Sequence, residues 1–334
     1  MHPLFEQIVR LSTDDGFFSF QNSLAQSLYE SLGQGYARNE NEVALVHKFA
    51  DTANGRKHGL MRLHAAMLHG SRSYVEFNYL DRPVTKELGD MAIIGLITNG
   101  KQRLFQRICI IQNKKSIGTG WDIDLEQLFL LKNFPPFSGN KGIFKGCRDM
   151  AFRNSSGCLG AFGLMDSPGD MLFAAAPVLS NCIIGKKSVS HADLAQIAKH
   201  SSTNNENGLG GMSCWPMLAG FHPMDWFHVM EKYFHHYGFP PFMFGSPGGQ
   251  AFLGNVMFLR DIYDLVRSWT QFSLGEITCV NDTVTNKTVD AFSNFLVRAA
   301  GFEGLPALPT GNLFGDREFQ GQMSVFLTHL NIEM

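Results

Sequence analysis

The chain has 334 residues, a formal net charge of −2 and a hydrophobic content of 44%. This composition predicts a globular fold with a sizeable core, and it argues against a disordered chain and against a generally basic protein that coats nucleic acid. No apolar run reaches the roughly 18 residues of a membrane span, so we expect a cytoplasmic protein with no membrane partner. The six cysteines are scattered without a CxxC pair, which is typical of reduced thiols.

The first part of the chain favours helices and then changes to a strand pattern. Apolar residues recur at helical spacing in residues 22–32, 40–54 and 56–70, which predicts three helices. Residues 73–80 alternate and are rich in aromatic and β-branched side chains, which predicts a strand.

A β-hairpin is the clearest element of the middle of the chain. Two apolar runs, residues 91–98 and 104–112, flank Asn99-Gly100, which is a strong hairpin signal. We expect both runs to lie in one sheet with residues 73–80. A helix should follow over 124–132, because Asp124 and Gln127 have the spacing of a capping box.

The sequence predicts an α/β fold in two parts. One more strand is expected within 157–165 or 170–179, and the polar, glycine-rich residues 200–212 are the predicted linker. Residues 1–200 should form a core with a central mixed sheet flanked by helices. Residues 212–334 should form a mainly helical region for recognition, regulation or oligomerisation, with helices near 224–237, 250–270 and 287–300.

The hairpin carries the residues that point to chemistry. Glu87 and Asp90 precede its first strand, and Gln112 and Lys114 end its second strand. Carboxylate and amide oxygens are ligands for Mg²⁺ or Mn²⁺, so Asp90, Gln112 and Glu87 are the predicted metal ligands. Lys114 shares a strand face with Gln112, where an ammonium group can orient a water molecule or neutralise charge on a phosphate.

This pattern, ExxD followed by QxK across a hairpin, resembles the PD-(D/E)xK nuclease superfamily. More narrowly, it is similar to the QxK variant of Mrr-like restriction endonucleases. The resemblance covers roughly residues 40–180 and implies a restriction-endonuclease-like core, Mg²⁺ dependence and cleavage of nucleic acid, usually DNA. It places Asp90 at the metal-binding acid, Gln112 at the (D/E/Q) position and Lys114 at the catalytic lysine.

Two positions of the motif depart from the usual superfamily pattern. Glu87 is assigned as the extra site acid, and Glu42 is the alternative because many members place this acid on a preceding helix. The proline that names the superfamily is replaced by Gly89.

Strand geometry gives an internal test of the motif. A strict two-residue turn at Asn99-Gly100 would place Asp90 and Gln112 on opposite faces, because strand side chains alternate. We therefore expect a β-bulge or a longer loop in the hairpin, with Gly89 as a candidate position for the bulge.

Basic residues also gather in this segment. Six lie between Lys86 and Lys115, against two acids, and they predict a positive surface for backbone phosphates. The alternative is a strand edge protected by solvated lysines. Besides Lys114, the residues expected to contact nucleic acid are Lys86, Lys101, Arg103, Arg107 and Lys115.

Together these features predict a Mg²⁺- or Mn²⁺-dependent phosphodiesterase, an endonuclease for which DNA is the expected substrate. A role as an effector of bacterial restriction or anti-phage defence follows by analogy, with a homo-oligomer or a regulatory sensor protein as partner. Two alternatives stay open. The first is an inactive nuclease-fold binding module that scaffolds a defence complex, and the second is a different enzyme or a ligand-gated sensor centred on residues 200–334, with its pocket near residues 245–249. The residues leave open DNA versus RNA, specificity, trigger, oligomeric state and the role of the aromatic residues 215–244.

Overall fold

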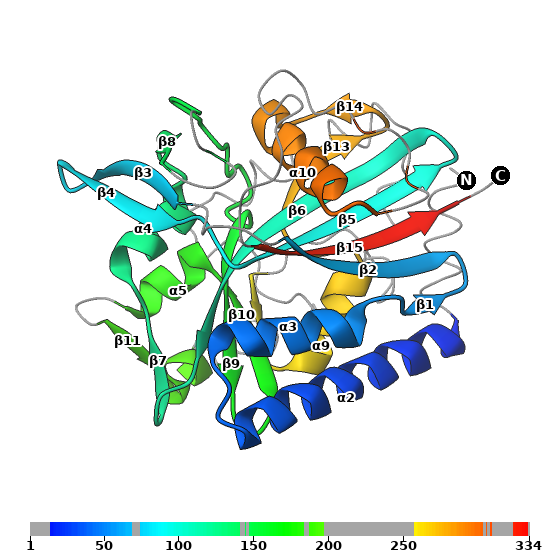
Figure 1. Ribbon diagram of the computed structural model, residues 1–334, viewed down its shortest axis with the longest axis horizontal. Coiled ribbons are helices and arrows are strands. Elements are labelled where there is room, and N and C mark those ends of the chain that lie inside the picture. Colours follow the sequence, from blue (N-terminus) through cyan, green and yellow to red (C-terminus); the bar gives the residue numbers. More distant parts are fainter. Residues whose placement is uncertain are drawn as a thin grey trace, which may run out of the picture.

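The computed structural model describes residues 14–68, 74–140, 144, 147–183, 187–196, 257–302, 305, 308 and 323–332. Among them, ten strands form one mixed sheet with helices on both faces (Figure 1). The path across the sheet is β1 (Lys57–His58), β2 (Met61–Leu68), β15 (Met323–Asn331), β5 (Met91–Asn99), β6 (Gln102–Lys115), β9 (Gly160–Asp166), β10 (Asp170–Ala175) and β12 (Phe258–Leu259). Off this path, β13 (Glu276–Val280) pairs with β6, and β14 (Thr283–Val284) pairs with β13.

The predicted hairpin, β5 and β6, forms the centre of this sheet. β15 lies between β2 and β5, antiparallel to the first and parallel to the second. β6 is 14 residues long, and its outer edge pairs with β13 over its first half and with β9, in parallel, over its second half. The predicted α/β class, with a central mixed sheet flanked by helices, is confirmed.

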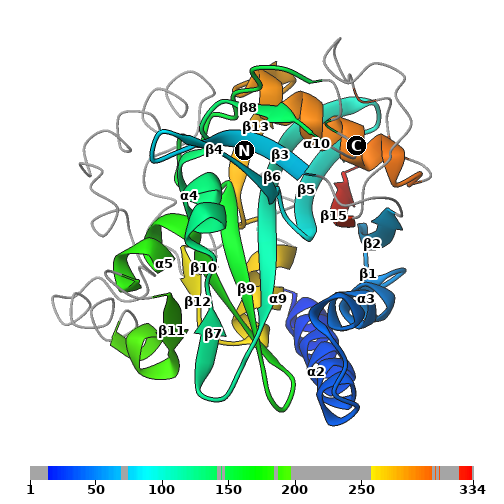
Figure 2. The same ribbon diagram turned by 60° about the vertical axis from the view of Figure 1, so that its left-hand side comes forward.

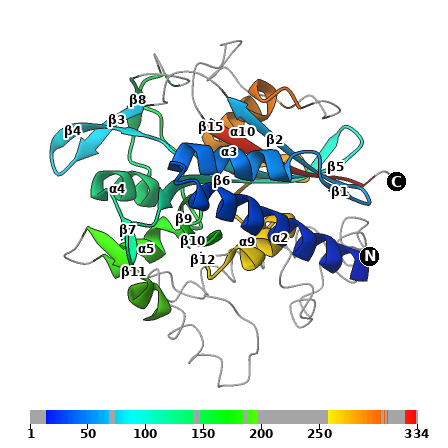
Figure 3. The same ribbon diagram turned by 60° about the horizontal axis from the view of Figure 1, so that its bottom comes forward.

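Helices cover both faces of the sheet, as the turned views show (Figures 2 and 3). Because neighbouring strand residues point to opposite faces, Ile111 packs under one helical layer and Ile110 under the other. This double burial explains why β5 and residues 108–111 of β6 are almost entirely apolar. The first layer is α2 (Asp15–Ala37), α3 (Glu42–Ala53) and α9 (Ile262–Thr270), and the second is α4 (Leu125–Asn133), α5 (Ala176–Cys182) and α10 (Lys287–Ala299).

The predicted strand at 73–80 is confirmed as β3 (Tyr74–Tyr79), but it does not lie in the main sheet. It pairs with β4 (Arg82–Glu87) and β8 (Phe137–Gly139) in a separate three-stranded sheet. β3 and β4 form a local hairpin across Leu80 and Asp81, whose φ angles of 49° and 60° suit a tight turn. A smaller sheet pairs β11 (Ser188–Ser190) with β7 (Gly120–Asp122).

The predicted helices at 22–32 and 40–54 both form, the first as part of α2 and the second, slightly shorter, as α3, but the helix predicted at 56–70 is wrong. This segment forms β1 and β2, joined by a turn at Gly59, where φ is 55°. β2 pairs with β15 over its whole length, so a partner distant in sequence overrides the local helical spacing.

The remaining predictions have mixed outcomes. Both candidate strands form, as β9 and β10, and the helices expected at 124–132 and 287–300 are α4 and α10. α9 forms the second half of the predicted 250–270 helix. The linker at 200–212, the 224–237 helix and the segments at 215–244 and 245–249 lie outside the described residues.

The C-terminal region, predicted to be mainly helical, contains both helices, α9 and α10, and strands in the part that the structure describes. Strands β12, β13, β14 and β15 all belong to the main sheet. In the same described part of the chain, no helix combines the length and the apolar character needed to cross a membrane. The five described cysteines are all free thiols.

A buried histidine in β15 makes stability depend on pH. His329 lies in the sheet with its Nε2 2.9 Å from Thr98 Oγ1. Burial, with smaller contributions from the nearby His64 and Arg62, lowers the pKa of His329 from 6.5 to about 4. The folded protein thus disfavours the charged form, and the stability that neutral His329 contributes is fully present above pH 6.5 and is lost toward pH 4.

We expect the free energy of unfolding to fall by up to ~3 kcal/mol over that pH range because of His329 alone. The measurement is urea unfolding at a series of pH values for the wild type and for His329→Gln, which cannot become charged. The variant should show a flatter pH dependence between pH 6.5 and 4. Equal slopes for both proteins would contradict the assignment.

Candidate active site

A cavity of about 330 Å³ lies where β6 ends and where β5 and β15 begin. Its lining comes from the main sheet, from the three-stranded sheet, from α3 and from α4. The four predicted catalytic residues all line it, namely Glu87, Asp90, Gln112 and Lys114.

A bulge in β6 brings Asp90 opposite Gln112. The hairpin closes tightly at the pair Asn99–Gln102, and the register then shifts by one residue at Leu104. One extra residue moves the rest of a strand to the other face, so Asp90 and Gln112 share a face. The predicted bulge is confirmed, but it lies at Leu104 and not at Gly89.

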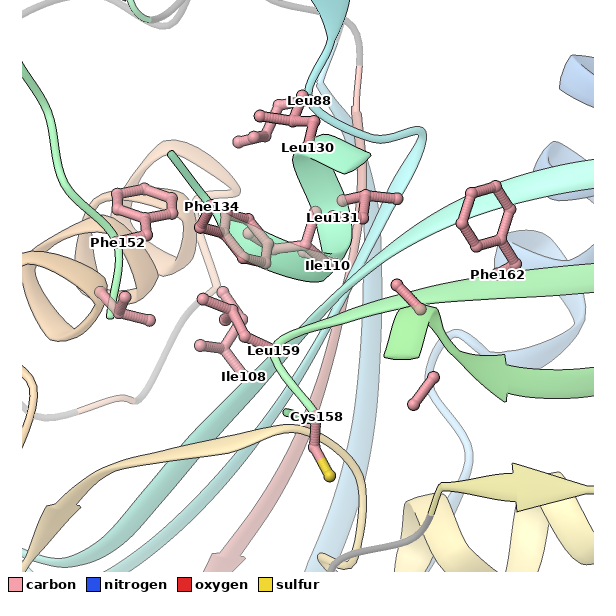
Figure 4. Packing of buried hydrophobic residues seen from close by; sticks show 14 of the residues in the cluster. Leu88, Ile108, Ile110, Leu130, Leu131, Phe134, Phe152, Cys158, Leu159 and Phe162 are labelled. Carbon is pink, nitrogen blue, oxygen red and sulfur yellow. The ribbon is translucent and has the colours of Figure 1, made fainter. Parts of the chain in front are cut away.

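The start of β5 is held by the apolar layer beneath the site (Figure 4). Leu88, Leu130 and Leu131 are fully buried together, which joins the segment before Asp90 to α4. Gly89 allows the same segment to lie close against β6, because a Cβ there would come within 2.8 Å of Ile110 Cγ2. The site acid therefore follows a rigidly packed segment.

Asp90 accepts two hydrogen bonds at one carboxylate oxygen. Its Oδ2 lies 2.9 Å from the backbone N of Asn113 and also accepts from Nε2 of Gln112. The amide oxygen of Gln112 accepts in turn from Nε2 of Gln127, which also donates to the carbonyl of Glu87 at 3.1 Å. Gln112, a predicted metal ligand, thus presents its nitrogen to Asp90 and its oxygen to Gln127.

Both candidates for the extra acid line the same cavity as Asp90. Glu87 is the last residue of β4. Glu42 lies in the first turn of α3, which Asn41 caps, and its Oε1 accepts a hydrogen bond of 2.9 Å from the backbone N of Lys115. This bond positions the α3 acid beside the end of β6, so the structure keeps both carboxylates as candidates.

The lysines near the cavity differ in their partners. The Lys114 side chain is half-buried and makes no hydrogen bond or ion pair with any residue that the structure describes. Lys86, in contrast, forms ion pairs with Asp124 at 2.5 Å and Glu126 at 2.8 Å, and Lys115 donates to the backbone carbonyl of Glu40, just before α3. Lys114 is therefore the lysine best placed to meet an anionic ligand.

The predicted basic surface is wrong at two positions, Arg103 and Arg107. Arg103 is buried against Asp290 at 2.9 Å, and Arg107 is fully buried, donating to the carbonyls of Phe272 and Gly275. These arginines attach α10 and the segment before β13 to the sheet, so neither reaches a nucleic acid. Lys101 is exposed, but it lies in the hairpin turn at the opposite end of β5 and β6 from Asp90.

The oxygen donors of the cavity fit Mg²⁺ or Mn²⁺ in their chemistry. Among the described residues, no three His, Cys, Asp or Glu side chains form a ready-made metal cluster. Mg²⁺ retains several waters, however, and one or two carboxylates suffice to hold it. Asp90, with Glu87 or Glu42 on the same cavity, provides such a set, whereas the oxygen of Gln112 is directed away.

Gln127 is the site residue that the sequence assigned to a different role. Its spacing from Asp124 predicted a capping box, and Asp124 does accept hydrogen bonds from the first turn of α4. The Gln127 side chain does not return to the helix end but reaches Gln112. Ser324 was also missed, because its backbone N–H meets the Asp90 carbonyl only when β15 joins the sheet.

Comparison with protein-family models, curated proteins and solved structures finds no match to this chain. A proposal for the function of this chain therefore depends on the fold and on the geometry of the cavity.

Proposed function

We propose that the chain is a metal-dependent nuclease with a restriction-endonuclease-like core of the PD-(D/E)xK type. The observation that carries this proposal is the convergence of Asp90, Gln112 and Lys114 on one cavity at the ends of β5 and β6. Glu42, from a helix that precedes these strands, lines the same cavity and adds support.

In this proposal, Asp90 holds Mg²⁺ or Mn²⁺ together with Glu87 or Glu42. The bound cation supplies an activated water and neutralises charge on the phosphate. The Asn113 N–H keeps the Asp90 carboxylate in place. Lys114 directs its ammonium group at the phosphate and stabilises the negative charge that develops there.

The proposed substrate is nucleic acid, with DNA as the first choice. Lys114, Lys86 and Lys115 are the basic residues of the hairpin segment at the cavity end, and the last two already have protein partners. Phosphate contact is therefore assigned first to Lys114. A role in bacterial restriction or anti-phage defence, with a homo-oligomer or a sensor protein as partner, rests on analogy with the superfamily.

The test is a cleavage assay on duplex and single-stranded DNA and RNA, with Mg²⁺, Mn²⁺ or EDTA. We expect metal-dependent cleavage that Lys114→Ala slows by about 10²- to 10³-fold, because a donor to the developing charge is lost. Metal binding should persist in this variant. Lys132→Ala, on the exposed end of α4, is the matched control and should cleave as the wild type does.

Equal rates for Lys114→Ala and the wild type would show that this cavity is not the active centre. Absence of cleavage by the wild type on every substrate would contradict the proposal and favour the alternative, an inactive nuclease-fold binding module.

A further inference from the structure

Two glutamine amides link the Glu87 backbone to the Asp90 carboxylate, and their orientations follow from the groups at the two ends. The Glu87 carbonyl can only accept a hydrogen bond, so the Gln127 atom 3.1 Å from it is the amide nitrogen. The second hydrogen of this nitrogen points to the Gln112 amide. The Gln112 atom on that side is therefore the oxygen.

The other end of the chain of hydrogen bonds gives the same answer independently. Asp90 Oδ2 accepts from the backbone N–H of Asn113, and an oxygen of an ionised carboxylate can only accept hydrogen bonds. The Gln112 atom that contacts Oδ2 must then be the nitrogen. Both ends require one orientation of each amide.

Burial makes this orientation hard to reverse. Gln112 is 4% exposed and Gln127 is 5% exposed, so water is poorly placed to replace a lost partner. If the Gln112 amide turned over, its NH₂ group would oppose that of Gln127 and its oxygen would oppose the Asp90 carboxylate. Two hydrogen bonds would be replaced by two repulsive contacts.

We propose that Gln127 is a positioning residue that makes Gln112 a hydrogen-bond donor to Asp90. In that role Gln127 keeps the Gln112 oxygen away from the cation, and Gln112 orients the metal-binding carboxylate instead of binding the metal itself. The metal part of this inference rests on the proposed function, whereas the amide arrangement is a property of the metal-free protein.

The first test measures the side-chain amides of the metal-free protein by ¹⁵N NMR. Hydrogen exchange of the Gln112 NH₂ group should be slower than that of the exposed Gln102, and Gln127→Met should accelerate it roughly tenfold, the equivalent of one hydrogen bond. Gln102→Met is the matched control and should leave Gln112 unchanged. Unaltered Gln112 exchange in Gln127→Met would overturn the proposal.

The second test measures Mn²⁺ affinity by calorimetry without nucleic acid. Gln127→Glu replaces the donor with an acceptor, so the Gln112 NH₂ group should turn toward it and direct the Gln112 oxygen to the cation. We expect Mn²⁺ to bind roughly tenfold more tightly, a typical size for a change next to a metal ligand. The double variant Gln127→Glu with Gln112→Met should lose this gain.

Added negative charge alone would also attract Mn²⁺, so Thr85→Glu on the exposed rim of the cavity is the charge control. It should give a smaller gain that does not need Gln112. Equal gains in Thr85→Glu and Gln127→Glu, or a gain that survives in the double variant, would overturn the proposal. If the wild type binds no Mn²⁺, the proposed metal-dependent nuclease function is contradicted. The NMR result still decides the role of Gln127 in that case.

Discussion

Replacing Asp90 by alanine is expected to remove metal binding and to slow cleavage by about 10³-fold or more, since the cation contributes several kcal/mol to the transition state. Asp90 is the acid at the centre of the hydrogen bonds around the cavity, with Asn113 and Gln112 both donating to it. Mn²⁺ calorimetry and the cleavage assay measure the two losses separately. Lys114→Ala should lose cleavage while it keeps the metal, which distinguishes the two roles.

Asp122→Ala, an exposed aspartate on β7, is the matched control for Asp90→Ala. It should bind metal and cleave as the wild type does. Folding should survive in Asp90→Ala, because Glu42 and Glu87 line the same cavity and lose a repulsive neighbour. Thermal unfolding checks this point. Full cleavage by a folded Asp90→Ala protein would exclude Asp90 as a metal ligand.

Asp290→Ala is expected to lower the free energy of unfolding by about 3 to 5 kcal/mol, because it leaves a buried guanidinium without its carboxylate. Arg103 and Asp290 are each about 5% exposed or less, and Arg103 Nη1 lies 2.9 Å from Asp290 Oδ1. Gln106 and Asn294 also bond to Arg103, but they are neutral and cannot balance its charge. Urea unfolding of the wild type and the variant measures the difference.

The double variant Arg103→Met with Asp290→Leu should cost much less than the single change. Burial raises the pKa of Asp290 even though Arg103 pulls it down, so desolvation outweighs the attraction within the pair. Replacing both charges with apolar side chains removes that desolvation cost. A double variant as unstable as Asp290→Ala would show that the ion pair itself is a large source of stability.

The part of the fold that the sequence predicted is the part made by neighbouring residues. The β5–β6 hairpin is signalled by Asn99-Gly100 and by two apolar runs, and α4 by the cap residue Asp124. The meeting of Asp90 with Gln112 and Lys114 at one cavity also follows locally, once a bulge is required to bring Asp90 onto the correct face.

What the sequence did not predict depends on partners distant in the chain. The sequence of β2 has helical spacing, but the segment is a strand because it pairs with β15. The spacing of Gln127 indicates a helix cap, but α4 packs beside the end of β6 and the Gln127 side chain reaches Gln112 there. The sequence predicts that Arg103 and Arg107 contribute to a phosphate-binding surface. No neighbouring residue in the sequence indicates that α10 and the segment before β13 bury these two side chains. Side-chain burial of this kind is a tertiary property.

The position of β15 has a consequence for the timing of activity during synthesis. Among the described strands β15 is made last, yet it lies between β2 and β5 and its Ser324 N–H bonds to the Asp90 carbonyl. Domains fold as their chain emerges from the ribosome, but here the two parts of the sheet are joined only once β15 has been released. A partly synthesised chain therefore carries Asp90, Gln112 and Lys114 without the strand that completes their cavity, so the proposed nuclease activity is expected only after β15 has joined the sheet.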